Sequence, residues 1–221
     1  YLTFYDGPYD NTTDAILDIL KEKGVHATFF LRHRPDHVAQ IQREIREGHT
    51  LANHSYSHKI KAVYQSADSC IKEIRDQQKW LTETVGVTPE IYRFPGGSPT
   101  AGNKKQTIAA ALAADGLGYV DWNCATGDGL PGVLTTEKAY QNAVSSVGEQ
   151  KIVVMLMHDY SAATLEALPD IIDGITEYCE KEDYQILLVN LRLYKKFEDT
   201  YYQSDRYGAI VQREIYKLLS K

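Results

Sequence analysis

The residues best suited to chemistry in this chain are a carboxylate and several imidazoles that follow apolar runs. Asp6 ends the segment TFYD, His54 and His58 stand four positions apart, and His158 follows the run VVMLM. One carboxylate and two imidazoles form a ligand set that binds Zn²⁺, Co²⁺ or a similar ion and leaves coordination positions open for water and substrate. The sequence therefore predicts a catalytic metal site.

Each of these residues also has a simpler interpretation. Two histidines at this spacing, taken alone, are as often surface or packing residues as metal ligands. Asp6 before Gly7 suits a turn, and His158 suits a buried core position. Arg93 suits a surface ion pair, although its apolar neighbours in YRFP favour an active-site role. The decision rests on how the chain positions these residues together.

Short β-rich runs alternate with longer helical patterns, which is typical of repeated βα units around a parallel sheet. The helical pattern is clearest at residues 12–23, which Asn11 and the two threonines after it would cap and Gly24 would end. Seven runs fit strands: residues 1–4, 26–31, 49–53, 90–94, 118–122, 152–157 and 185–191.

Four of the chemically interesting residues share one position relative to these strands. Asp6, His54, Arg93 and His158 all lie at or just past the C-terminal end of a predicted strand. In βα barrels this end of the strands carries the chemistry. The shared position favours the metal and catalytic interpretation over the simpler ones.

Composition narrows the class of protein. A chain of 221 residues with 43% hydrophobic content can bury a substantial core as one domain without disulfides. The net charge of -6 and the scattered basic residues exclude nucleic acid as an expected partner. We expect no membrane contact by this segment, because no apolar stretch approaches a membrane span. The cysteines, which we expect to be buried apolar residues, are Cys70, Cys124 and Cys179.

Five ordered segments resemble the polysaccharide deacetylases of the NodB-homology type, carbohydrate esterase family 4. That family carries TFDDGP, H-S/T-x-x-H, R-x-P-x-G-like, D/W-rich and L-x-H segments, and the matching residues here are 3–8, 54–58, 93–97, 121–128 and 156–158. The resemblance implies a distorted (β/α) barrel of about seven parallel strands in a single domain at residues 1–195. We expect the extension at residues 196–221 to form a helix packed on the barrel.

The resemblance implies metal-dependent removal of N-acetyl groups from a cell-wall or chitin-like amino-sugar polymer. Asp6, His54 and His58 would hold the divalent ion, with zinc expected first and cobalt, nickel or manganese as alternatives. His158 would protonate the leaving amine, and Asp128 would keep that imidazole charged.

The resemblance also implies roles around the substrate. Arg93 would orient an active-site carboxylate. The side chains of Leu156, Trp122 and Tyr160 would form a wall for the acetyl methyl group or the sugar face, although Trp122 fits core packing equally well. The substrate-binding positions implied by the resemblance are Pro95, Gly96, Trp122, Leu156 and Tyr160.

Two positions depart from the family pattern. Tyr5 stands where the family has the aspartate that acts as general base, and a phenol with a pKa near 10 is a poor proton acceptor at neutral pH. The carboxylate that Arg93 would orient is therefore missing. Gly129 follows Asp128 where many members have tryptophan, so one aromatic side chain of the substrate groove is absent.

Three functions follow from these residues. The chain is a deacetylase of reduced rate, in which the metal alone, Asp159 or Asp128 replaces the base. Alternatively, it is a metal-retaining pseudoenzyme that binds glycan without turnover, or a hydrolase of another C–N amide bond. Because the first predicted strand begins at residue 1, we expect an export or anchor segment upstream, and hence a secreted or cell-surface protein.

Overall fold

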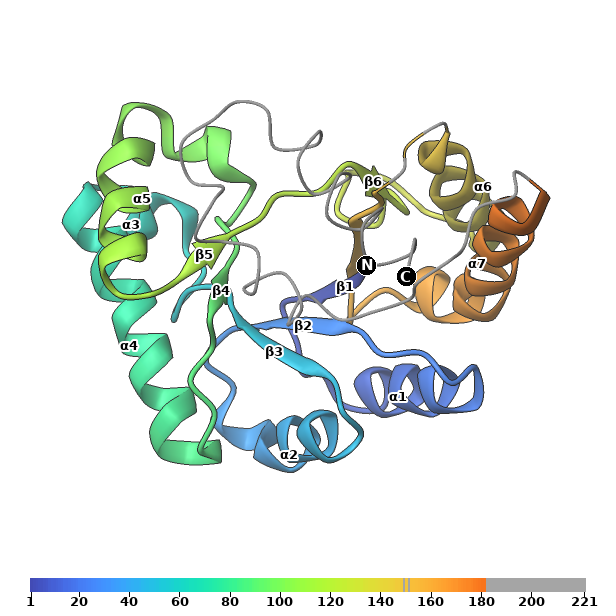
Figure 1. Cartoon of the computed structure of the whole chain (residues 1–221), viewed down its shortest axis with the longest axis horizontal. Helices are drawn as coiled ribbons and strands as arrows, with labels where there is room; N and C mark the ends of the chain where they lie inside the picture. Colours follow the sequence, from blue (N-terminus) through green and yellow to red (C-terminus); the bar gives the residue numbers. More distant parts are fainter. Residues whose placement is uncertain (149, 151, 182–221) are drawn as a thin grey trace, which may run out of the picture.

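The computed structural model describes residues 1–148, 150 and 152–181. Seven parallel strands form one curled sheet in the order β5-β4-β3-β2-β1-β7-β6, and helices cover its outside (Figure 1). The architecture is the predicted distorted (β/α) barrel in a single domain. The strands are β1 (Leu2–Tyr5), β2 (Thr28–Leu31), β3 (Thr50–Asn53), β4 (Ile91–Tyr92), β5 (Gly118–Tyr119), β6 (Cys124–Ala125) and β7 (Met155–His158).

The helices alternate with the strands along the chain. In the described part of the chain, no helix is both long and apolar enough to cross a membrane. Two short 3-10 helices, η1 (Pro35–His37) and η2 (Ser98–Lys104), precede α2 and α5. The α-helices are α1 (Thr12–Glu22), α2 (Val38–Arg46), α3 (Ile60–Val63), α4 (Ala67–Val85), α5 (Lys105–Ala114), α6 (Thr136–Val147) and α7 (Ala162–Lys181).

Six of the seven predicted strands correspond to β1, β2, β3, β4, β5 and β7. The seventh, residues 185–191, lies outside the described residues, as do the predicted domain boundary and the predicted helix in 196–221. Strand β6 was not predicted. It has only two residues, and two residues show no periodicity.

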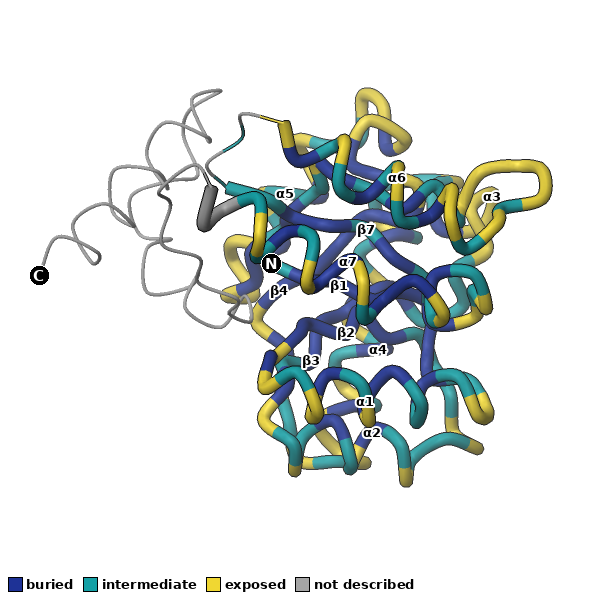
Figure 2. The backbone as a smooth tube through the Cα atoms, turned by 90° about the vertical axis from the view of Figure 1, so that its right-hand side faces the viewer, coloured by how far each residue is buried: buried dark blue, intermediate teal, exposed yellow. Residues whose placement is uncertain are grey.

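Alternation along the strands separates an outer core from the barrel interior, because successive side chains point to opposite faces. Phe4 and Phe29 belong to the larger core with the helices, and their ring centroids are 5.3 Å apart. Tyr5 and Phe30, the next residues of β1 and β2, stack at 5.0 Å inside the barrel. The strands are consequently buried on both faces, while the helices keep exposed outer sides (Figure 2).

The loop after β1 is held by the residue that follows β7. Asn11 occupies the N-cap position of α1, but its side chain makes no capping hydrogen bond, so that expectation was wrong. The Thr13 hydroxyl instead accepts from the Tyr9 N–H and donates to the Asp159 carboxylate at 2.7 Å. A Cβ atom at Gly7 would collide with the same carboxylate. Asp159 therefore fixes the loop that begins at the end of β1.

Glu44 on α2 is completely buried, and neither of its carboxylate oxygens has a hydrogen-bond partner among the described residues. Burial, assisted by the charges of Asp159 and Asp14, raises the pKa of the Glu44 carboxyl well above its ordinary value. The folded protein then keeps Glu44 protonated at a pH where the unfolded chain ionises it. This difference lowers the free energy of unfolding as the pH rises above the unfolded-state pKa.

Glu44→Gln should therefore raise the melting temperature at pH 7, because it removes the cost of keeping this carboxyl protonated. At pH 4, where Glu44 is largely protonated in both states, the gain should nearly vanish. Thermal unfolding followed by circular dichroism at both pH values measures the effect. The control is Glu22→Gln, which changes an exposed glutamate of α1. A lower melting temperature of Glu44→Gln at pH 7 would show instead that the charged form is stabilised in the fold.

Candidate active site

One edge of the barrel gathers the chemically interesting side chains. Asp6 follows β1, His54 follows β3, Arg93 follows β4, and His158 is the last residue of β7. These strands run parallel in one sheet, so their C-terminal ends lie at the same edge. The positions that were predicted separately from the sequence thus converge in space.

Asp6, His54 and His58 form a candidate metal site. Asp6 Oδ1 lies 3.8 Å from His54 Nε2 and 3.5 Å from His58 Nε2. One ligand atom from each of the three residues lies within 4.8 Å of the others. Asp6 Oδ1 is buried and has no hydrogen-bond partner in the described part of the chain, so it is available to a cation. The donor set and this orphaned oxygen fit a divalent ion.

The backbone at two of these ligands is in the left-handed region. Asp6 has a φ of 67° and His58 a φ of 55°, values that residues other than glycine rarely adopt. Such backbone strain is concentrated at functional sites, where surrounding contacts hold it in place. For Asp6, the contacts of the following loop with Asp159 provide that constraint.

Both histidines of the triad are prepared for metal binding. His54 Nδ1 lies 2.8 Å from the backbone carbonyl oxygen of Arg93, which can only accept, so Nδ1 carries the proton and Nε2 is left free. Burial lowers the pKa of His54 to about 3 and also lowers the pKa of His58. Both imidazoles are therefore neutral at neutral pH, which is the form that ligates metals.

Asp6 remains ionised in the same surroundings. Burial alone would raise the pKa of its carboxyl, but at the acidic pH where this carboxyl titrates, the charges of His54, His58 and Arg32 together hold it below the ordinary value. Arg32 contributes directly, because its Nε lies 3.5 Å from Asp6 Oδ1. The triad thus offers one negative and two neutral ligands.

A second pair of residues can carry a proton. His158 Nδ1 lies 2.7 Å from one Asp128 oxygen, and the other oxygen accepts from the His158 N–H at 2.8 Å and the Thr164 hydroxyl at 2.7 Å. Burial alone would lower the pKa of His158, but the hydrogen bond and charge of Asp128 raise it above the ordinary value. This imidazole can therefore be protonated near neutral pH and donate from Nε2.

The structure explains why a glycine, Gly129, follows Asp128. A Cβ atom at Gly129 would lie 2.8 Å from His158 Cε1, so this loop runs directly against the imidazole. The ring of Tyr160, two residues after His158, also packs near this imidazole, and the two ring centroids are 4.9 Å apart. Tyr160 is 42% exposed, which leaves its ring accessible to a substrate.

Tyr5 lies between the two groups of catalytic candidates. It is buried, and its ring centroid is 5.3 Å from that of His54 and 5.7 Å from that of His158. Its hydroxyl lies 3.3 Å from Thr3 Oγ1, one position deeper on the same face of β1. The phenol oxygen is consequently turned toward the barrel interior, away from the edge that carries Asp6.

Arg93 is completely buried, and among the described residues no carboxylate forms a close ion pair with it, although the charge of Asp121 acts on its guanidinium. Burial lowers the pKa of its guanidinium well below the ordinary value. Its Cζ lies 4.6 Å from the ring centroid of Tyr5 and 4.3 Å from that of Phe30. Arg93 therefore contacts the Tyr5 ring where the resemblance implied a carboxylate. Its nitrogens donate to the carbonyl oxygens of Val120 and Asp121 and to the Thr3 hydroxyl.

The predicted substrate positions differ in accessibility. Trp122 and Leu156 are partly buried and pack against the interior cluster that contains Tyr5. Pro95 is buried, and its carbonyl accepts from the Tyr64 hydroxyl at 2.9 Å, so it is held by the protein itself. The neighbouring residue Gly96 is exposed.

Three residues beside the candidate metal site were not predicted from the sequence: Arg32, Arg34 and Tyr9, whose hydroxyl accepts from Arg32. Both arginines donate to the backbone carbonyl oxygen of Asp6. Their position just after β2 was the available signal, since that strand ends at the same edge. Thr164, which donates to Asp128, lies on helix α7. It could not be identified from the sequence, because the signal for site residues was their position at the ends of strands.

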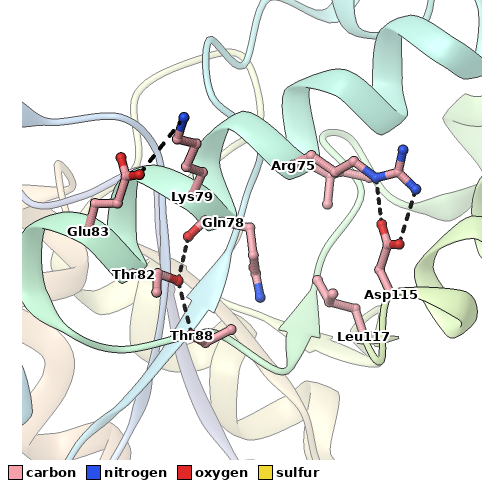
Figure 3. Close-up of a pocket in the computed structure, with 9 residues that line it drawn as sticks. Arg75, Gln78, Lys79, Thr82, Glu83, Thr88, Asp115 and Leu117 are labelled. Atoms are coloured by element: carbon pink, nitrogen blue, oxygen red, sulfur yellow. Dashed lines mark hydrogen bonds and ion pairs between the residues drawn. The ribbon is translucent and has the colours of Figure 1, made fainter.

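A separate groove of about 490 Å³ lies between α4 and the loops before β4 and β5 (Figure 3). Its charged residues are paired within the groove, Arg75 with Asp115 at 2.7 Å and Lys79 with Glu83 at 3.8 Å. None of the predicted site residues lines it. It lies toward the N-terminal ends of the strands, so it does not compete with the edge described above.

Comparison with known proteins identifies a family for this chain and agrees with its fold. The family model described as polysaccharide deacetylase matches residues 1–119. The putative polysaccharide deacetylase YheN of Bacillus subtilis is 34% identical over 190 residues, which cover 80% of this chain and 63% of YheN. The chain spans about 63% to 65% of the length of the first curated relatives it matches.

Solved structures extend the similarity. The catalytic domain of peptidoglycan N-acetylglucosamine deacetylase from Eubacterium rectale has a TM-score of 0.75 and 32% identity, covering 86% of this chain and 87% of that one. A CE4 family pseudoenzyme from Bacillus anthracis has the same fold, with a TM-score of 0.69 and 22% identity over 88% of this chain and 64% of that one. The chain, with its family model match over more than half its length, belongs to the polysaccharide deacetylase family.

Proposed function

We propose that this chain is a metal-dependent hydrolase that removes N-acetyl groups from a cell-wall or chitin-like amino-sugar polymer, and that Tyr5 limits its rate. The observation that carries the proposal is the convergence of Asp6, His54 and His58 beside the His158–Asp128 pair at one edge of the barrel. Because such polymers lie outside the cell membrane, the proposal includes a secreted or cell-surface location.

The proposed roles divide between the two groups. A divalent ion, for which zinc best fits one carboxylate and two imidazoles, would supply Lewis acidity toward the amide carbonyl. Asp6, His54 and His58 would hold it. His158 gives its Nε2 proton to the departing amine, and Asp128 fixes the imidazole through Nδ1 and favours its charged form.

The weak point of this site is the general base. By the resemblance, Tyr5 stands at the base position of the family, and its hydroxyl lies beside Thr3 rather than beside the metal ligands. A neutral phenol in that orientation cannot accept a proton from an attacking water. The same observation favours a second candidate function, a pseudoenzyme that keeps the metal and binds glycan without turnover.

The purified protein should bind about one zinc ion per chain, and His58→Ala should abolish this binding because it removes a ligand. Elemental analysis measures the stoichiometry. The melting temperature should rise with added zinc in the parent and not in the variant, since a ligand that binds only the folded state stabilises it. The control is His26→Ala, which removes an exposed imidazole away from the triad. Retention of stoichiometric zinc by His58→Ala would contradict this ligand set.

For deacetylation, His158→Ala should lower kcat by a factor of about 100 or more while leaving bound metal unchanged, since a general acid contributes on that order. Asp128→Asn should act through the imidazole pKa. Asp128 raises that pKa, so its loss should shift the alkaline limb of the kcat profile toward lower pH. Loss of metal from His158→Ala would make His158 a ligand, and an unshifted limb would remove the role of Asp128.

Tyr5→Asp should increase acetate release from an N-acetylglucosamine oligomer by about 10² to 10⁴, because a positioned base contributes in that range. The new carboxylate would also give the buried guanidinium of Arg93 a charge partner. Tyr5→Phe should match the parent if the phenol has no catalytic part.

The matched control is Tyr5→Asn, which opens the same space without supplying a base. An equal gain in Tyr5→Asn would assign the effect to steric relief. A Tyr5→Asp variant that binds zinc and glycan but releases no acetate would contradict the missing-base account.

A further inference from the structure

Two guanidinium groups converge beside the candidate metal site. Arg32 Nε donates to the Asp6 carbonyl oxygen at 3.3 Å, and Arg34 donates to the same oxygen through Nε and Nη2 at 3.4 and 3.3 Å. Tyr9 lies between them, with its ring 4.3 Å from Arg34 Cζ and its hydroxyl 3.1 Å from Arg32 Nη2. One carbonyl oxygen is thus the shared acceptor of two cations.

The protein balances the positive charge of this pair only in part. Within the described residues, Asp6 is the carboxylate that reaches Arg32, at 3.5 Å, and no carboxylate forms an ion pair with Arg34. The nearby Asp10 pairs with His37 instead. Two like charges that share one acceptor repel each other, and an anion placed against them would relieve that repulsion.

Both guanidinium groups are accessible to solvent, and their contacts with Asp6 hold them in place. The Arg32 side chain is 22% exposed, and Arg34 is half-buried. Each guanidinium has five N–H donors, and the contacts to Asp6 and Tyr9 use only part of them. The remaining donors can bind a planar anion such as a carboxylate at two points.

A row of rings connects this pair to the candidate general acid. Tyr9, which Arg34 covers, meets the ring of Tyr160 edge-on at 5.8 Å. Tyr160 in turn lies 4.9 Å from the His158 ring. Aromatic faces of this kind support sugar rings. A glycan whose amide faces His158 would therefore extend across Tyr160 and Tyr9 toward Arg34.

We propose that Arg34, supported by Arg32, binds a carboxylate carried by the sugar next to the one that is deacetylated. This inference rests on the proposed function and specifies its substrate class: an amino-sugar polymer with anionic substituents is preferred over a neutral one. Arg34 is then a specificity-determining residue outside the metal site and the proton-transferring pair.

The test compares the binding of two soluble tetrasaccharides by isothermal titration calorimetry, with zinc-loaded and with chelator-treated protein. One is the neutral N-acetylglucosamine tetramer, and the other alternates N-acetylglucosamine with N-acetylmuramic acid, which carries a carboxylate. The carboxylated probe should bind about tenfold more tightly, and added salt should reduce that preference. The preference should persist without zinc, since it comes from the arginines.

Variants identify the source of the preference. Arg34→Gln should bring the two affinities within about twofold by weakening only the carboxylated probe, whereas Arg34→Lys should keep part of the preference. The matched control, Arg46→Gln, removes an exposed charge at the end of α2 and should leave the preference intact.

Two outcomes would overturn the proposal: equal affinity for both probes, or a carboxylate preference that survives in Arg34→Gln. The readout needs no turnover, so it is separate from the proposed reaction. Equal binding together with acetate release would overturn the subsite and leave deacetylation standing. A preference that requires Arg34, with no acetate released even by Tyr5→Asp, would support the subsite and contradict deacetylation.

Discussion

The arrangement of this site depends on one buried cation. The Arg93 guanidinium lies in the barrel interior, where an unpaired charge is costly unless its donors are satisfied. Carbonyl oxygens after β5 and the Thr3 hydroxyl of β1 accept its protons, and the rings of Tyr5 and Phe30 cover its faces. These contacts join β1, β2, β4 and the segment after β5 beneath the edge that carries the candidate ligands.

The contact of the Arg93 guanidinium with aromatic rings, in place of a carboxylate, has a chemical consequence. A carboxylate at position 5 would balance the guanidinium and accept a proton, whereas the tyrosine ring can only solvate it. The phenol hydroxyl lies beside Thr3, so the ring separates the metal ligands from the interior without supplying a base. The triad and the His158–Asp128 pair are positioned by the strand ends and by the contact of Asp159 with the loop after β1.

Much of this could be predicted from periodicity and strand ends. The βα alternation predicted the parallel sheet, and the resemblance implied that it closes into a distorted barrel. The position of Asp6, His54 and His158 after apolar runs predicted their shared edge. The two-residue strand β6 could not be predicted, since it is defined by pairing with β7 and not by its own residues. The orientation of the Tyr5 hydroxyl and the convergence of Arg32 and Arg34 on Asp6 could not be predicted either, because both depend on tertiary contacts. They arise from side chains brought together by different strands.

The central claim is that an intact three-residue metal site stands beside a tyrosine that is not a ligand. Anomalous diffraction at the zinc edge from zinc-soaked crystals tests it most directly. The account predicts one ion bound by Asp6, His54 and His58 at about 2.0 to 2.2 Å, with the Tyr5 oxygen outside the coordination shell and beside Thr3. Zinc bound through the Tyr5 oxygen, or the absence of zinc between the three side chains, would contradict it.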